Sequence, residues 1–233
     1  MKVIIEYELV PHTAPGKGMQ MVPGAIKIPA PPLIEVPKDW TMAHYDAAQG
    51  VEINDKNEVV KWRDISGNKH DLIPFKNPTV KSAILKKDDL PAVQFNGSCA
   101  LYAQLKPEPC TGMMFLAVVK VPSTEIKTRQ SKNNRIMVTV GKTGADYSHG
   151  LALSTNHLKG DKIEITDKAK YWHNPIEPTL IGVGRMFLIK KGQPALYSFG
   201  LKGDIMEMFA FKPPLPDGYL RLLKLKLKKK YDI

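Results

Sequence analysis

Most of this chain is divided into short apolar runs separated by turn residues, and that pattern limits the fold more than any other feature of the sequence. Within each run apolar and polar side chains tend to alternate, as they do in a half-buried strand. The runs are Val59–Trp62, Ala92–Phe95, Phe115–Val121, Arg135–Val140, Gly150–Ser154, Lys162–Thr166, Thr179–Val183, Met186–Ile189 and Asp204–Phe211. Such short, regularly punctuated strands predict an all-β protein, an antiparallel two-sheet β-sandwich, rather than alternating βα units.

The first 38 residues differ from the rest in their proline content. Seven prolines fall between Pro11 and Pro37, together with three glycines. Because proline fixes φ and lacks a backbone N–H, this stretch cannot form a helix or an inner strand. It also contains more apolar residues than a solvated linker. We therefore predict an extended N-terminal arm over residues 1–38, lying against its own domain or a partner, and a single domain over residues 39–233.

The C-terminal segment has the features of a short helix. Leucines recur at helical spacing from Leu220 to Leu227, after Pro216 and Asp217, which suit a first turn. Leucines that alternate with lysines in the same segment fit a strand equally well. The helix is favoured because lysines stabilise the carbonyl end of a helix. We predict a basic helix over residues 215–230.

The net charge of +11 suits a polyanionic partner, such as nucleic acid, an acidic polysaccharide or an acidic protein surface. Nucleic acid is not the expected partner, because no aromatic residues interleave with a basic stripe. No apolar run is long enough to span a membrane, and the start does not resemble a signal peptide, so we expect synthesis in the cytoplasm. Cys99 and Cys110 are then expected to be free, packed thiols, the alternative being a disulfide that closes a short loop.

Several segments of the chain resemble one known family. They are Trp40–Ala47, Val60–Leu72, Leu90–Gly97, Gly203–Phe211, Leu215–Asp217 and Tyr219–Tyr231. In this order they are similar to the concanavalin A-like, laminin-G-like lectin/glucanase domains of microbial and phage proteins. The resemblance spans about residues 38–233. It implies a concanavalin A-like jelly roll with a closing helix, and it does not specify a ligand.

The resemblance implies structural roles for the recurring Trp and Asp positions. Trp62 is expected to fill the core, and Asp64 is expected to tie a turn with Ser66 and Asn68 through side-chain to backbone hydrogen bonds. The alternative is a calcium site, since Asp64, Asn68 and Asp71 offer hard oxygen ligands and lectins of this fold often carry Ca²⁺. The full calcium-loop pattern is absent. No other cofactor is expected.

The glucanase branch of this family carries a catalytic nucleophile and a general acid on one strand. The corresponding segment here is Lys202-Gly203-Asp204-Ile205-Met206-Glu207, which places Lys202 at the position of the nucleophile. A lysine cannot form the glycosyl ester, so we predict that the protein is not an enzyme. Asp204 and Glu207 are expected to bond the closing helix or neighbouring loops. A divergent glycoside hydrolase remains the alternative if a second acid lies near Glu207.

Two loops combine aromatic rings with short polar side chains, as carbohydrate-binding sites do. The candidate carbohydrate-binding residues are Tyr147, His149, Tyr171, Trp172, His173 and Asn174. The alternative is structural, with Trp172 capping the edge of the sandwich and Tyr147 starting a strand.

The arm, the missing signal and the missing catalytic pattern together predict a non-enzymatic structural protein of a phage virion, either a capsid decoration or a head or tail appendage. The arm would attach the protein to other virion proteins in a homo-oligomeric or multi-copy assembly, and the sandwich would face outward towards host glycans. No membrane partner is expected. The alternative is a bacterial cell-surface polysaccharide-binding module, which would need an export signal.

Overall fold

The computed structural model describes residues 36–76, 81–87, 90–106, 108–110, 112–127, 135–142, 148–167, 177–190 and 193–233. Residues Ile34–Ile233 form one compact unit. Nearly all of the predicted arm, up to residue 35, lies outside the described residues, so the arm stays a prediction.

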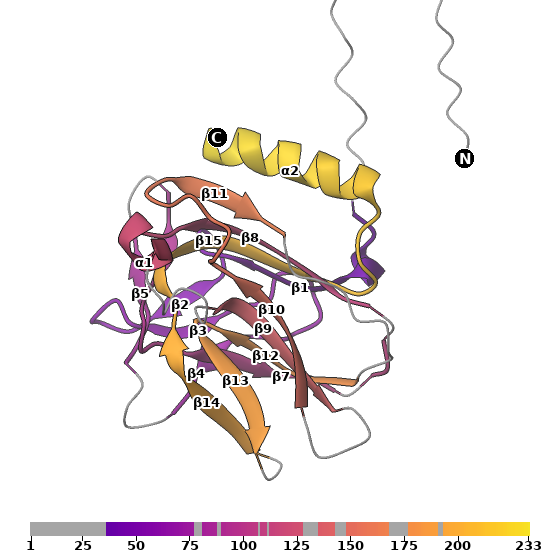
Figure 1. The fold of residues 1–233 in the computed structure, drawn as a ribbon, viewed down its shortest axis with the longest axis horizontal. Helices are drawn as coiled ribbons and strands as arrows, with labels where there is room; N and C mark the ends of the chain where they lie inside the picture. The colour runs from indigo at the N-terminus through magenta and orange to yellow at the C-terminus, as the bar shows by residue number, and fades with distance from the viewer. Residues whose placement is uncertain are drawn as a thin grey trace, which may run out of the picture. The chain divides into compact units, whose positions relative to one another are not determined.

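Two antiparallel sheets form the body of this unit (Figure 1). The six-stranded sheet consists of β1 (Thr41–Asp46), β5 (Ile84–Lys86), β6 (Ala92–Asn96), β8 (Met114–Lys120), β11 (Ile163–Thr166) and β15 (Lys202–Phe211). Its order is β11-β8-β15-β6-β5, and β1 also pairs with β15. The five-stranded sheet, in the order β10-β9-β12-β7-β4, consists of β4 (Ile73–Pro74), β7 (Leu101–Gln104), β9 (Arg135–Lys142), β10 (Ser148–Ser154) and β12 (Glu177–Val183).

Other elements connect and flank the two sheets. They are η1 (Lys38–Trp40), the hairpin β2 (Val51–Ile53) and β3 (Val59–Trp62), α1 (Ser123–Lys127), the hairpin β13 (Arg185–Lys190) and β14 (Gln193–Gly200), and α2 (Asp217–Tyr231). All nine predicted runs coincide with strands, which confirms the all-β sandwich with a C-terminal helix. The strands β1, β2, β4, β5, β7 and β14 were not predicted.

Strand β8 shows why its sequence is apolar without interruption. Phe115, Ala117 and Val119 belong to the central core, where residues of both sheets meet. The alternate residues, such as Leu116 and Val118, belong to a second apolar cluster that includes buried residues of α2. The strand is therefore buried on both faces, a situation in which strict alternation of polar and apolar residues is not expected.

A register shift in β15 changes which residues face the helix. The shift lies between Ile205 and Glu207, opposite β8. Ile205 and Met208 both belong to the central core, although they are three positions apart. Residues on the same face of a regular strand are an even number of positions apart. The extra residue is a β-bulge, and it leaves Glu207 free to contact α2 instead of the core.

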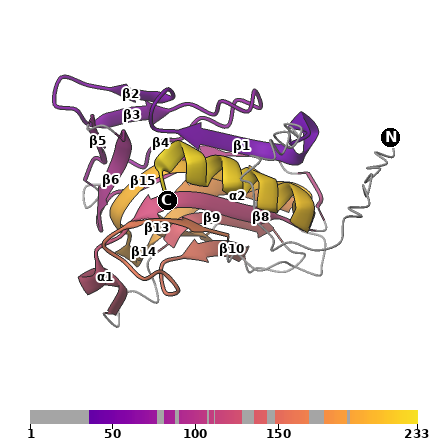
Figure 2. The same ribbon diagram turned by 90° about the horizontal axis from the view of Figure 1, so that it is seen from above.

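Helix α2 lies across the outer face of the six-stranded sheet (Figure 2). Leu227 and Tyr231 are buried against this face, together with Leu215, which precedes the helix. The observed helix, Asp217–Tyr231, confirms the predicted helix within two residues. No helix in the described part of the chain is long and apolar enough to cross a membrane.

Two further predictions about packing are confirmed. Trp62 is fully buried in the central core. Cys99 and Cys110 are free thiols and both are buried. Burial raises the pKa of both thiols, which keeps them protonated and unreactive near neutral pH.

Candidate functional site

Most of the predicted carbohydrate-binding residues fall outside the described residues. These are Tyr147, Tyr171, Trp172, His173 and Asn174. His149 lies in β10, where its backbone pairs with Gly141 of β9, and its side chain is outside the described part. The carbohydrate site in these loops therefore stays a prediction.

Asp64 ties the turn that follows β3. Its Oδ1 accepts hydrogen bonds from the backbone N–H of His44 and of Ser66, both at 2.9 Å. Its Oδ2 accepts a third from the backbone N–H of His70, at 3.1 Å. The carboxylate thus fixes the turn to β1, which confirms its predicted structural role.

The other two candidate calcium ligands also bond the backbone. The Asn68 side-chain amide donates to the carbonyl oxygens of Thr41 and Met42, at 2.7 and 3.1 Å. Asp71 Oδ1 accepts from the backbone N–H of Asp64, at 2.9 Å. Among the residues that the structure describes, no group of three or more His, Cys, Asp or Glu side chains is placed to hold a metal ion. The calcium site gains no support from this arrangement.

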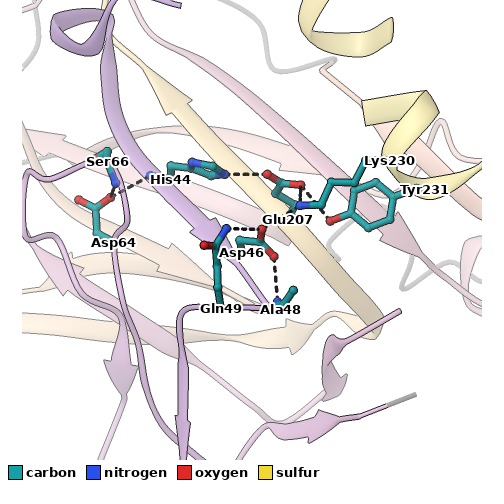
Figure 3. A network of polar contacts seen from close by, with 9 residues as sticks. All are labelled: His44, Asp46, Ala48, Gln49, Asp64, Ser66, Glu207, Lys230 and Tyr231. Atoms are coloured by element: carbon teal, nitrogen blue, oxygen red, sulfur yellow. Dashed lines mark hydrogen bonds and ion pairs between the residues drawn. The ribbon is translucent and has the colours of Figure 1, made fainter. Parts of the chain in front are cut away.

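A network of five side chains joins α2 to the six-stranded sheet (Figure 3). We call it the helix lock: His44, Asp46, Glu207, Lys230 and Tyr231. Glu207 is its centre, because its Oε1 accepts from His44 Nε2 at 2.7 Å and its Oε2 accepts from Lys230 Nζ at 2.7 Å and from the Tyr231 hydroxyl at 2.9 Å. Lys230 also donates to Asp46 Oδ2 at 2.8 Å.

The remaining contacts of the helix lock keep its members in place. Asp46 accepts from the Gln49 side-chain amide at 2.9 Å and from the backbone N–H of Ala48 at 2.8 Å. The His44 ring stacks on Phe209, with 4.0 Å between ring centroids. Since a carboxylate can only accept, His44 Nε2 carries the proton that it shares with Glu207.

The two carboxylates of the helix lock stay ionised despite their burial. The side chains of Glu207 and Asp46 are only 5% and 3% exposed. Burial alone would raise the pKa of Glu207, but hydrogen bonds from His44 and Lys230 outweigh it and the pKa falls below its ordinary value. In Asp46, likewise, hydrogen bonds from Lys230, Gln49 and Ala48 outweigh burial and lower the pKa. Both carboxylates are therefore ionised at neutral pH.

These shifts predict how stability depends on pH. Because the folded-state pKa values of Glu207 and Asp46 are lowered, their contribution is complete above about pH 5 and is lost as pH falls through those values. Hydrogen bonds to Asp46 and Glu207 raise the pKa of Lys230, and burial next to Glu207 raises the pKa of Tyr231. The contribution of these two groups to stability is therefore lost as pH rises above about 10. Urea unfolding across this range should give a plateau between the two limits, and Glu207→Gln should flatten the acid limb. An unchanged acid limb in that variant would contradict the assignment.

The arrangement offers little for acid–base chemistry. Asp46 is the second acid near Glu207, but both carboxylates bond the same ammonium group of Lys230. The contacts of Glu207 confirm that it bonds the closing helix. Asp204 forms an ion pair with Lys86 of β5, at 2.9 Å. Sequence reasoning did not identify His44, Asp46 or Lys230 as functional or structural partners of Glu207. The sequence indicates only that His44 and Asp46 lie among apolar residues, as polar residues of a buried strand do.

A polar cleft of about 550 Å³ opens elsewhere on the same unit. Its lining comes from η1, the start of β1, the turn tied by Asp64, the end of β7 with the loop after it, the start of β12 and the residue after β15. The residues are Asp39, Thr41, Met42, Asn68, Lys69, His70, Gln104, Leu105, Lys106, Glu108, Pro178 and Lys212. Because these residues are scattered along the chain, no local motif could have indicated the cleft.

Comparison with known proteins does not assign the chain to a family. No protein-family model matches the sequence, and no curated protein matches it. The functional argument therefore rests on the sequence pattern and on the geometry described above.

Proposed function

We propose that this protein is a non-enzymatic structural protein of a phage particle, built on a concanavalin A-like jelly roll and present in several copies. The observation that carries the non-enzymatic part is the helix lock. Its two carboxylates, Glu207 of the glucanase-like segment and Asp46 beside it, are buried beneath α2 and both pair with Lys230. A glycosidase needs one carboxylate facing the sugar as nucleophile and another as acid.

The position of α2 supports the same proposal. The helix covers the outer face of the six-stranded sheet, so this face does not present an open surface to a polymer. The helix is also tied at its C-terminal turn to the sheet by Lys230 and Tyr231. A domain whose sheet face is covered by a fixed helix suits a structural role on the surface of a particle.

The jelly-roll assignment rests on the resemblance and on the layering of the sheets. Two antiparallel sheets of six and five strands pack face to face, and a helix follows the last strand in the chain. These features agree with the architecture that the resemblance implies.

Deletion of the arm tests whether the protein belongs to a particle. Residues 1–33 should be deleted, because Ile34–Ile233 forms a compact unit by itself. We expect the truncated protein to keep its unfolding transition but to be lost from purified particles, measured by quantitative mass spectrometry. Full-length protein with Lys226→Gln, an exposed change on α2, is the matched control. Undiminished incorporation of the truncated protein would overturn the role of the arm.

The hydrolase alternative has its own test. The wild-type protein should release no reducing sugar from a panel of polysaccharides. Release that Glu207→Gln abolishes would replace the present proposal with a divergent glycoside hydrolase, because the nearby Asp46 would then be acting as the second acid.

A further inference from the structure

The polar cleft contains cationic groups that the fold does not use. Lys69 and Lys106 line it, and neither makes a hydrogen bond or an ion pair with a described residue. Lys212 pairs with Glu108, at 3.0 Å between Nζ and Oε2. Three lysines therefore face two carboxylates, those of Asp39 and Glu108. This excess of positive charge favours an anionic ligand.

Apolar as well as polar residues line the cleft. Met42, Leu105 and Pro178 are buried residues among its lining. Around them lie hydrogen-bonding side chains such as Gln104 and Thr41. A ligand that fits both parts has a C–H face and several hydroxyl groups, as a pyranose ring does.

His70 lines this cleft, and the contact of one of its ring nitrogens is defined. Its Nδ1 is 2.9 Å from the carbonyl oxygen of Met42 and must donate to it, because a carbonyl only accepts. In the neutral ring Nε2 is then an acceptor, and no described residue bonds to it. It can accept a hydrogen bond from a sugar hydroxyl.

We propose that the polar cleft binds a short acidic saccharide, with its carboxylate between Lys69 and Lys106 and its C–H face on Met42 and Leu105. The volume of about 550 Å³ lies within the range typical of small-molecule sites. The proposal rests on the proposed function, since it names the class of glycan that an outward-facing domain would bind. The net charge of +11 favours the same class by attracting polyanionic chains.

The test uses the full-length protein with two matched pairs of probes, namely trigalacturonate with its methyl ester, and 3′-sialyllactose with lactose. We expect calorimetry to detect binding of at least one acidic probe, with its neutral counterpart at least about tenfold weaker. Lys106→Gln and Lys69→Asn should each weaken binding by about tenfold. Asparagine suits position 69 because Lys69 has a φ of 63°. Lys226→Gln, outside the cleft, should leave the affinity unchanged.

Three results would overturn the proposal: no binding of either acidic probe at millimolar concentration, equal binding of the neutral counterparts, or full affinity in both cleft variants. Thermal unfolding of each variant checks that the fold is intact. Incorporation of the double variant into particles is measured in parallel. If it is incorporated but neither it nor the wild type binds saccharide, the cleft assignment fails while the particle assignment stands. If the wild type binds saccharide but is absent from particles, the particle assignment fails while the cleft assignment stands.

Discussion

Replacing Glu207 with alanine is expected to lower the free energy of unfolding by about 2–4 kcal/mol. The change removes the carboxylate that accepts three hydrogen bonds, so His44 Nε2 and the Tyr231 hydroxyl each lose their acceptor. Tyr231 is buried, so its hydroxyl cannot recover the lost bond from water at no cost. The side chain of Lys230 is 39% exposed and keeps its ion pair with Asp46, which limits the loss of stability. Urea unfolding at pH 7 measures the effect.

The control is Glu52→Ala, which breaks an exposed ion pair with Arg63. Surface pairs of this kind contribute little to stability, because solvent screens both charges. Equal unfolding midpoints for the two alanine variants would show that the helix lock does not hold α2 to the sheet. Glu207→Gln, which keeps one acceptor oxygen, should fall between them.

Gly184→Ala is expected to destabilise the protein by about 3–5 kcal/mol. Gly184 lies between β12 and β13 with a φ of +85°, where an L side chain is strained. A Cβ there would lie 2.3 Å from Phe95 Cδ1 and 2.8 Å from the Cys99 carbonyl oxygen. Phe95 is buried in the central core, so neither neighbour can move aside cheaply. Thermal and urea unfolding both report the change.

Two other glycines separate the causes of this effect. Gly67 has a φ of +97° but nothing within 4 Å of an added Cβ, so Gly67→Ala should cost only the backbone strain, about 1–2 kcal/mol. Gly218 in α2 has open space and no such φ, so Gly218→Ala should be neutral or slightly stabilising. A loss in Gly184→Ala no larger than in Gly67→Ala would exclude the steric contribution.

Nine strands could be predicted because their alternation or continuous apolar run was bounded by turn residues. Val59–Trp62 was predicted with the bounds that β3 has. Strands such as β5 and β4 were missed because they have only three and two residues, too few to show a period. Strand β1 was missed because its polar residues His44 and Asp46, both members of the helix lock, interrupt the apolar pattern.

The helix lock could not be predicted, because its contacts depend on long-range packing. His44 and Glu207 are 163 residues apart, and Lys230 and Asp46 are 184 apart. Glu207 also reaches α2 only through the bulge in β15, and a regular alternation from Ile205 would have directed it to the core. The sequence identified the carboxylate but not its partners.

The sequence by itself determined the class of fold and the closing helix, because hydrophobic periodicity, turn residues and helix-end preferences act over a few neighbouring residues. Only the tertiary structure decided that Glu207 and Asp46 pair with Lys230 beneath α2. Only the tertiary structure also decided that Lys69 and Lys106, which form no ion pair with a described residue, line one cleft. Both outcomes depend on which distant segments pack together. That packing is set by burial of the whole core, and no short stretch of sequence contains it.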